Sequence, residues 1–410
     1  MKKNKRKTIL LMATLDTKAE EIFFIEKLIK KRWFNVIIIN TGTVAYKNQI
    51  NNTSTQIVNI NNRTLCEYKK DKYMNEIVKE GKILVNRLYN SGKINGIMGI
   101  GGGTGTSIGS AIMQSLPKGF PKLMVSTITT GKATCGPYFG TSDITVMYSI
   151  VDLQGINYIT ARILSNAVGA ICGMVNTYYD DNLVKYYKSK KTIALSMMGT
   201  TTKGALRALK NLEKNGFQVI SFHQNGTGGI AMEEMIGDGI FQGVFDLSLH
   251  EVGDRELGGL HGAIRPIRLE TAGKKGIPQL VVPGCLVYYV AGPVDSLPLE
   301  TRKRKYFVHS PELTLVRAIP KEMIHIGKVV AKKLNQAKGP VSVCIPLKGF
   351  CEPDKEGSEL FDPEGNNAFI ESLKKYLSKN ISIVEVDAHI NDSEFIDIAT
   401  EEFLRIMESI

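Results

Sequence analysis

The stretch GIMGIGGGTGTSIGSAI (residues 96–112) runs from a short apolar segment through a cluster of glycines into a segment of helical character. A strand, a glycine-rich turn and a helix in this order are typical of α/β proteins whose turns approach an anionic ligand. Two familiar phosphate motifs do not fit. A Walker loop needs a lysine where this chain has Thr106, and the fingerprint G-x-G-x-x-G lacks its third glycine. The stretch therefore predicts a Rossmann-like unit and leaves its ligand open.

The flanking sequence repeats a strand–helix–strand order. KTILLMAT, DTKAEEIFFIEKLIKK and FNVIIINTGT in the first half are matched by KTIALSMMG, TTTKGALRALKNLEKNG and FQVISFHQNGTGG in the second. Lys18 pairs with Lys203, and Asn40 with Asn225, both at an offset of 185 residues. Any two α/β halves share some likeness, but the equal spacing favours an internal duplication of a βαβ-type domain.

Strands alternate with helices along both halves, a pattern that predicts parallel sheets with helices on both faces. We predict an α/β fold of two tandem Rossmann-like domains with mainly parallel sheets and a ligand cleft between them. The polar segment TYYDDNLVKYYKSKK marks the boundary. It separates a nucleotide-binding domain, residues 1–183, from a second Rossmann-like domain, residues 190–410, which would bind substrate or close the cleft.

Composition narrows the class of protein. Six cysteines without a CxxC pair are too sparse for a disulfide scaffold, and no HxxxH or HExxH pair occurs. We therefore predict reduced thiols, a cytoplasmic location and no tightly bound structural metal. No apolar run approaches the roughly 20 residues of a membrane span. The apolar run after the basic amino terminus is too short for a signal peptide.

The formal net charge of +12 raises the question of nucleic-acid binding. Nine of the positive charges lie in two short segments, residues 2–7 and 302–305, and the rest of the chain is close to balance. Proteins that bind single-stranded nucleic acid interleave basic residues with aromatic ones, on which the bases stack, and this chain shows no such interleaving. We therefore expect a small anionic ligand, no membrane association and no nucleic acid.

Three turns of the first half follow predicted strands and offer groups that bind phosphate. Lys18 brings a positive charge to a helix N-terminus, where it can bind a phosphate. Thr17 either binds the phosphate or only caps the helix. Asp16 either holds Mg²⁺ through water or caps the helix. The glycine loop and the Thr/Gly-rich loop at residues 126–144 add backbone N–H groups and hydroxyls, although the glycines alone could form a tight packing turn. The predicted nucleotide-binding residues are Asp16, Thr17, Lys18, Gly101, Gly102, Gly103, Thr104, Gly105, Thr106, Thr127, Thr129, Gly131, Ser142 and Asp143.

The loops of the second half differ in character. FHQNGTGG, SLHEVGDRELGG and YFVHSPELTLVR contain acids, histidines and arginines, the residues of proton transfer and carboxylate binding. Each histidine taken alone is more often a structural residue with satisfied hydrogen bonds.

The ordered set TLDTK, GIGGGTGTSIGSAI, GTSDITVMYSIVDLQGIN, FHQNGTGGIAMEE, DLSLHEVGDRELGG, GIPQLVVPG and YFVHSPELTLVR resembles one family over nearly the whole chain. It is similar to the family of the ATP-binding domain of the tomato mosaic virus resistance protein. The resemblance implies two Rossmann-like subdomains, ATP bound in the amino-terminal part, and a homodimer. In plants the domain is fused to a TIM-barrel domain resembling phosphoenolpyruvate hydrolases. This chain lacks that module, so a separate TIM-barrel protein is a candidate partner.

The resemblance also selects residues in the second half. Glu251 and Asp254 fit a family pattern similar to DLTTTEVADEL, from which His250 departs, and His309 matches a family HNP element. Together with Arg317 they form the predicted catalytic set, facing a small anionic second substrate.

We expect a nucleotide-binding enzyme that takes ATP, alone or with Mg²⁺, and acts on a small anionic metabolite. Two alternatives remain open. One is a nucleotide-sensing or partner-binding module without turnover. The other is a nucleotide-independent enzyme acting on a phosphorylated or carboxylate substrate.

Overall fold

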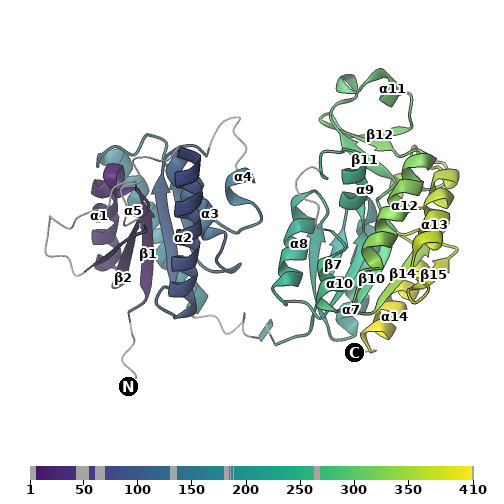
Figure 1. Ribbon diagram of the computed structural model, residues 1–410, viewed down its shortest axis with the longest axis horizontal. Coiled ribbons are helices and arrows are strands. Elements are labelled where there is room, and N and C mark those ends of the chain that lie inside the picture. Colours follow the sequence, from purple (N-terminus) through teal and green to yellow (C-terminus); the bar gives the residue numbers. More distant parts are fainter. Residues whose placement is uncertain are drawn as a thin grey trace. The chain divides into compact units, whose positions relative to one another are not determined.

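The computed structural model describes residues 6–42, 55–60, 70–129, 136–179, 184, 186–187, 189–262 and 268–408. The chain divides into unit 1, Met1–Leu183, and unit 2, Val184–Ile410. Each unit contains a parallel six-stranded sheet flanked by helices (Figure 1). This confirms the predicted fold class of two tandem Rossmann-like domains with mainly parallel sheets. The predicted cleft between the units stays a prediction.

The sheet of unit 1 has the strand order β3-β2-β1-β4-β5-β6. Its strands are β1 Thr8–Ala13, β2 Asn35–Asn40, β3 Gln56–Asn59, β4 Gly96–Gly101, β5 Lys122–Ser126 and β6 Thr145–Tyr148. The helices are α1 Leu15–Lys31, α2 Lys70–Asn90, α3 Gly103–Met113, α4 Gly136–Phe139 and α5 Tyr158–Tyr179.

Helices cover both faces of this sheet, which explains the almost continuous apolar run TILLMA in β1. Successive side chains of a strand point to opposite faces. Ile9 and Leu11 accordingly pack in the core formed with α1 and α5, whereas Leu10 and Met12 pack in the core formed with α2 and α3.

Helix α5 is the one helix in the described part of the chain that is long and apolar enough to cross a membrane. It begins where the side-chain oxygen of Asn157 accepts hydrogen bonds from the backbone N–H groups of Ile159 and Thr160. Leu164 and Val168 are fully buried in the core beneath β1 and β4, so this helix has an internal packing role.

The main sheet of unit 2 has the order β15-β14-β10-β9-β7-β8, and a small antiparallel sheet has the order β11-β13-β12. The strands are β7 Thr192–Met197, β8 Gln218–His223, β9 Gly243–Ser248, β10 Gln279–Gly284, β11 Tyr288–Ala291, β12 Tyr306–Ser310, β13 Leu313–Arg317, β14 Val341–Pro346 and β15 Ser382–Val386. The helices are α7 Thr202–Lys214, α8 Thr227–Gly237, α9 His250–Glu256, α10 Thr271–Lys275, α11 Leu299–Arg302, α12 Pro320–Leu334, α13 Pro363–Tyr376 and α14 Ser393–Met407, with single 3₁₀ turns at η1 Gly199–Thr201, η2 Val294–Ser296 and η3 Glu352–Asp354.

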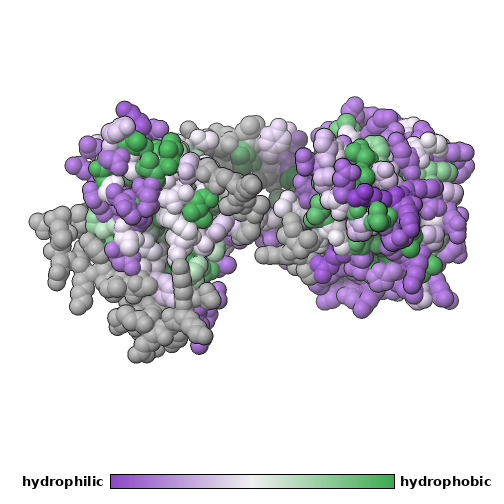
Figure 2. All heavy atoms as spheres, turned by 90° about the horizontal axis from the view of Figure 1, so that it is seen from above, coloured by the Kyte–Doolittle hydropathy of each residue, from purple (hydrophilic) through white to green (hydrophobic). Residues whose placement is uncertain are grey.

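Helices again cover both faces of the main sheet. The side chains of α7 and α14 share one core with Ile193 and Leu195 of β7, and those of α8 and α10 share another with Ala194. The space-filling view in Figure 2 shows mostly hydrophilic side chains on the face of unit 2 that it presents, with small hydrophobic patches between them.

The two main sheets share a strand order around their first strand. β1 lies between β2 and β4, and β7 lies between β8 and β9. The paired strands end at Ala13–Asn40 in unit 1 and at Met197–His223 in unit 2. By strand register, therefore, the counterpart of Asn40 is His223. The sequence comparison identified the correct strands but, in choosing Asn225, misplaced this position by two residues.

Candidate functional site

The turns after β1 and β4 meet in unit 1 where the strand order reverses, the place at which parallel α/β sheets bind ligands. They border a pocket of about 590 Å³, called here the switch-point pocket. Its lining residues are Thr14, Thr17, Lys18, Gly102, Gly103, Thr104, Gly105, Gln154 and Gly155. The structure thus brings together two of the loops that were predicted to bind phosphate.

Two helices begin at this pocket. The N-cap residues of α1 and α3 are Thr14 and Gly102, and neither provides a side-chain hydrogen bond to its helix. The first backbone N–H groups of a helix have no partner within the helix, and they carry the positive end of its dipole. At α1 the N–H of Leu15 already donates to Oδ1 of Asn40, and the N–H of Lys18 donates to the Thr14 carbonyl. The start of α3 is therefore the main source of N–H donors for an anion in the pocket.

Glycines let the backbone of the second loop fold closely on itself. A Cβ atom at Gly101 would lie 2.7 Å from the Cα of Gly105 and 3.0 Å from the backbone N of Thr106. A Cβ at Gly103 would meet nothing within 4 Å. The Thr106 hydroxyl is turned inward and lies 2.7 Å from the Ser126 hydroxyl. Gly101 and Thr106 therefore shape the loop, while the residues between them border the pocket.

The turn after β1 departs from regular helix geometry at Lys18, whose φ and ψ are −129° and 20°. The Lys18 ammonium donates a hydrogen bond to the carbonyl of Leu153, in the loop after β6. The Thr14 and Thr17 hydroxyls lie 3.0 Å apart. Lys18 therefore lines the pocket and also ties α1 to a neighbouring loop.

Asp16 does not line the switch-point pocket. A Cβ at Gly42 would lie 2.6 Å from its Oδ1, which puts the carboxylate beside the end of β2. None of the described residues that line the pocket is a carboxylate. These residues therefore offer no carboxylate ligand to Mg²⁺.

Asp143 lies at the opposite edge of the sheet. Its carboxylate is 2.7 Å from the Lys122 ammonium at the start of β5, and it accepts a hydrogen bond from the backbone N–H of Gly119. Asp143 and the adjacent Ser142 come just before β6, at the amino edge, whereas the pocket lies at the carboxyl edge. Both were predicted to lie in a loop after a strand, but the end of this loop leads into the next strand, β6.

The remaining predicted residues of unit 1 follow β5. The hydroxyl of Thr127 would lie 3.6 Å from a Cβ at Gly102, so Thr127 is beside the pocket. Thr129 is two residues further along the same loop, and Gly131 lies outside the described residues.

Gln154 and Gly155 were missed by the sequence analysis. Gly155 has a φ of +79°, and its backbone N–H donates a 2.8 Å hydrogen bond to Glu21 of α1. Glycine is a turn signal, so this loop could have been included if the short strand β6 before it had been predicted.

A second pocket, of about 260 Å³, lies in unit 2 and is called here the histidine pocket. Its lining residues follow β7 and β8 or come from the loop after α9 and the small antiparallel sheet. They are Met198, Gly199, Thr200, His223, Asn225, His261, Tyr288, Val290, His309, Leu313 and Leu315. Of the four predicted catalytic residues, only His309 is among them. In the described ranges, no three His, Cys, Asp or Glu residues are arranged to hold a metal ion.

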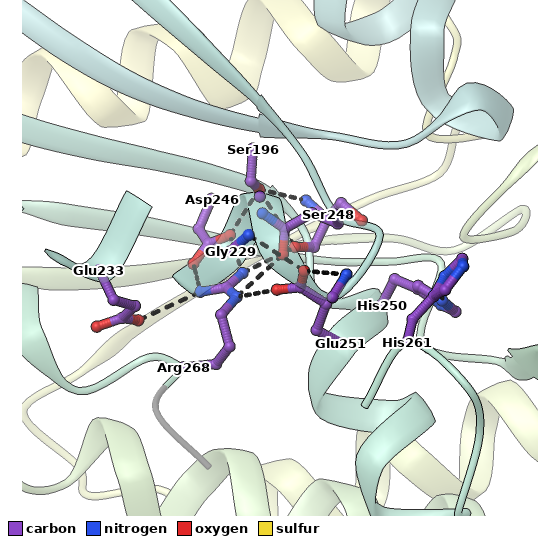
Figure 3. A network of polar contacts seen from close by, with 12 residues as sticks. Ser196, Gly229, Glu233, Asp246, Ser248, His250, Glu251, His261 and Arg268 are labelled. Atoms are coloured by element: carbon purple, nitrogen blue, oxygen red, sulfur yellow. Dashed lines mark hydrogen bonds and ion pairs between the residues drawn. The ribbon is translucent and has the colours of Figure 1, made fainter. Parts of the chain in front are cut away.

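Glu251 belongs to a buried network around Arg268 (Figure 3). The Arg268 guanidinium lies 2.8 Å from Asp246, 3.1 Å from Glu251 and 3.4 Å from Glu233. Burial alone would lower the pKa of Arg268, but Asp246, Glu251 and Glu233 together outweigh it and raise that pKa above its usual range. Glu251 also accepts N–H hydrogen bonds at the start of α8. Its position is that of a structural counter-ion.

Asp254 is also buried. It accepts 2.6 Å hydrogen bonds from the backbone N–H groups of Gly262 and Val290, which fastens the loop containing His261 to β11. Burial raises the pKa of Asp254 to about 6. Its position is that of a support for the pocket wall.

Arg317 links strand β13 to helix α13. It donates hydrogen bonds to the Val287 carbonyl at 2.8 Å and to the Asn366 side chain at 2.7 Å. The structure therefore does not bring the four predicted catalytic residues to one site.

Two histidines form a chain that leads into the histidine pocket. Nδ1 of buried His250 lies 3.2 Å from the Cys285 carbonyl oxygen, and its Nε2 lies 3.1 Å from Nδ1 of His261. Burial lowers the pKa of His250 to about 3. Burial, with contributions from His223 and His309, also lowers the pKa of His261. No sequence spacing marks this pair, because the contact depends on the loop that Asp254 holds.

We expect the stability advantage of the wild type over His250→Gln to shrink as the pH falls. The pKa of His250 is about 3 in the folded state, against 6.5 for a histidine exposed to water, so the unfolded state binds a proton first. The stabilising contribution is complete above the unfolded pKa. It is lost at about 1 kcal/mol per pH unit as the pH falls below about 6.

Urea unfolding of both proteins between about pH 7 and pH 5 measures this difference. The raised pKa of Asp254 makes the folded state more stable as the pH falls, which is opposite to the effect of His250. Asp254 and His261 are present in both proteins, so the comparison isolates His250. A difference that does not change with pH would contradict a neutral, buried His250.

The basic segment at residues 302–305 has local partners in unit 2. Arg302 donates a 2.9 Å hydrogen bond to the Leu297 carbonyl, and Arg304 lies 2.9 Å from the Glu322 carboxylate. Lys305 donates to the Phe361 carbonyl at 2.5 Å. These contacts give the segment a role in fastening the loop before β12.

Comparison with known proteins adds a family to this geometry. Residues 7–180 match the N-terminal domain, and residues 190–407 the C-terminal domain, of the uncharacterised protein family UPF0261. A UPF0261 protein of Clostridium tetani is 40% identical over 98% of this chain and 99% of its own length. The ToMV resistance protein Tm-1(GCR237) of Solanum lycopersicum is 34% identical over 76% of this chain, but the match spans 41% of that protein.

Among solved structures, Acinetobacter baumannii MurG aligns with 99% of this chain at 10% identity and a TM-score of 0.28, which is too low to carry an argument. The resemblance to the tomato protein's family, stated from the motifs, is confirmed. With both of its domains matched, the chain belongs to the UPF0261 family.

Proposed function

We propose that unit 1 binds ATP, with the phosphates in the switch-point pocket. The observation that carries the proposal is the meeting of two helix N-termini, those of α1 and α3, at one pocket where the strand order reverses. N–H groups at helix N-termini and a lysine ammonium suit a polyphosphate. None of the described residues that line the pocket is a carboxylate, so none of them would repel the negative charge of a phosphate.

The choice of ATP over other polyphosphates comes from the family resemblance. A pocket of about 590 Å³ is within the range of small-molecule sites, about 300–1,000 Å³. Any Mg²⁺ would be held mainly by the phosphates and water, since Asp16 is turned toward the end of β2. The same resemblance supports a homodimer with a separate TIM-barrel partner, and the sparse cysteines support a cytoplasmic location.

An enzymatic role for the bound nucleotide rests on unit 2. The histidine pocket is the candidate site for a small anionic second substrate. It replaces the catalytic set predicted from the sequence, because Glu251, Asp254 and Arg317 do not line it. A sensing module without turnover is the alternative. ADP release that appears only when a small acid is added would favour the enzyme, and its absence across a panel of acids would favour the module.

Isothermal titration calorimetry of the full chain tests the nucleotide proposal. We expect saturable binding of ATP with a Kd below about 1 mM, the range of useful metabolite sites. ADP should bind more weakly, and a simple phosphorylated acid such as 3-phosphoglycerate should give no saturable heat. Binding of the phosphorylated acid without ATP would instead favour the nucleotide-independent enzyme. No heat with millimolar ATP would overturn the proposal.

Lys18→Ala should weaken ATP binding by about 1–3 kcal/mol, because it removes a charge-assisted hydrogen bond to phosphate. The matched control is Lys203→Ala. Lys203 lies in the corresponding turn of unit 2, is 76% exposed and is 3.8 Å from Glu352. It should leave ATP affinity unchanged.

Because Lys18 also bonds to the Leu153 carbonyl, thermal unfolding of both variants must accompany the titration. Unchanged affinity in a folded Lys18→Ala protein would limit Lys18 to tying α1 to the loop after β6. Equal losses in both variants would show a general charge effect.

A further inference from the structure

We propose that the histidine pocket binds a small, apolar 2-hydroxy acid, whose hydroxyl donates a hydrogen bond to Nε2 of His261. The pocket belongs to unit 2, and the proposal does not depend on ATP binding. Its basis is a chain of hydrogen bonds that fixes which nitrogen of His261 is bare.

The chain begins at a backbone oxygen. The Cys285 carbonyl can only accept, so Nδ1 of His250, 3.2 Å away, carries the hydrogen. His250 is fully buried and neutral, since burial lowers its pKa to about 3, so its Nε2 is bare. Across 3.1 Å that nitrogen accepts the hydrogen of Nδ1 of His261. A neutral His261 then has its lone pair on Nε2.

The bare nitrogen is available to a ligand. His261 is half-buried and lines the pocket, and in the described part of the chain no group is hydrogen bonded to its Nε2. Burial, His223 and His309 lower the pKa of His261, so it is unprotonated at neutral pH. Asp254, whose carboxylate fastens the adjacent Gly262, holds the loop in place.

The hydroxyl keeps its proton and donates a hydrogen bond to Nε2 of His261, because an alcohol is a far weaker acid than an imidazolium. His250 is a positioning residue: its Nε2 accepts from His261 and also lies 3.7 Å from Oδ1 of Asp254.

The lining of the pocket selects the ligand. Val290, Leu313 and Leu315 provide an apolar wall that suits a branched hydrocarbon body. None of the described residues that line the pocket is a carboxylate. Exposed His223 and His309 each have a ring N–H that can donate a hydrogen bond to a substrate carboxylate. The volume of about 260 Å³ limits the ligand to a small acid.

Side-chain ¹⁵N NMR of the histidine-labelled full chain tests the tautomer, and the chain has only six histidines to assign. We expect His261 at neutral pH to carry its hydrogen on Nδ1. In His250→Phe, which removes the acceptor, the Nε2–H form should become the major one. A purely structural His250 would leave the tautomer unchanged. A wild-type His261 that is charged, or protonated at Nε2, would overturn the proposal without any variant.

Carbethoxylation by diethyl pyrocarbonate, mapped by peptide mass spectrometry, tests the ligand. The probe is 2-hydroxy-4-methylpentanoate, and its uncharged amide is the control. We expect millimolar acid to slow the reaction of His261 by roughly threefold or more, as occupancy above Kd requires. The rate at His325, which lies outside the pocket and 2.8 Å from Glu256, should not change. Equal protection by acid and amide, or no protection by either, would overturn the assignment of a hydroxy-acid anion.

Discussion

Arg268→Met should lower the free energy of unfolding by about 3–5 kcal/mol, the usual cost of removing one partner from a buried ion pair. Asp246, Glu251 and Glu233 are at most 5% exposed, and each lies within 3.4 Å of the Arg268 guanidinium. Methionine fills a similar volume but leaves these carboxylates without a counter-ion. The expected fall in stability therefore comes mainly from the uncompensated charge of the carboxylates and less from lost packing.

Urea unfolding followed by far-UV circular dichroism measures this effect, with pulse proteolysis to assign the transition to unit 2. The matched control is Arg207→Met. Arg207 also makes two hydrogen bonds to one carboxylate, at 2.7 Å and 2.5 Å from Asp397, but it lies on the surface. We expect little change there. Adding Asp246→Asn to Arg268→Met should recover part of the loss. Equal effects of the two arginine substitutions would contradict the role of the buried network.

Gly101→Ala should reduce ATP affinity by about tenfold or more and destabilise unit 1, because the new methyl group would clash with backbone. The atoms it would meet, the Cα of Gly105 at 2.7 Å and the N of Thr106 at 3.0 Å, cannot move without reshaping the loop. Gly103→Ala, where the new Cβ meets nothing within 4 Å, should keep or slightly raise stability. Its methyl group narrows the pocket, so affinity should still fall.

Calorimetric titration with ATP and thermal unfolding of each variant separate these effects. Gly169→Ala is the control, because it adds a methyl group in α5 where nothing lies within 4 Å. Gly101→Ala that binds ATP as tightly as Gly169→Ala would show that the loop geometry does not matter for the ligand.

The fold was predictable because its signals are local. The apolar run of β1 and the glycine turn after β4 lie within short windows of sequence. The repeated strand–helix–strand order then set the architecture of both units. The register error, Asn225 for His223, arose because the spacing of two turn residues was used as the offset, 185, whereas the strands themselves are offset by 184 (β1 to β7) and 183 (β2 to β8) residues.

The site in unit 1 was predictable only in part. Lys18 and the residues from Gly102 to Gly105 do line one pocket, because turns that follow neighbouring parallel strands meet at one edge. Asp143 was misplaced because the loop that contains it starts at the carboxyl edge of the sheet and ends at the amino edge. Sequence spacing alone does not say at which edge a residue of such a loop lies.

The site in unit 2 was largely hidden. Glu251 and Asp254 look like acids available for chemistry, but they are buried counter-ions and backbone acceptors. His261 was missed because its partner His250 lies eleven residues away across an irregular loop. The small antiparallel sheet that supplies Tyr288 and His309 depends on long-range pairing that no local pattern specifies.

The central claim, that ATP binds at the switch-point pocket of unit 1, is tested most directly by hydrogen–deuterium exchange of the full chain with and without saturating ATP. We predict slower amide exchange in peptides covering residues 14–21 and 101–106, with no change in the corresponding turn of unit 2 at residues 198–204. Bound ATP that leaves the first two segments unchanged, or that slows exchange only in unit 2, would contradict the claim.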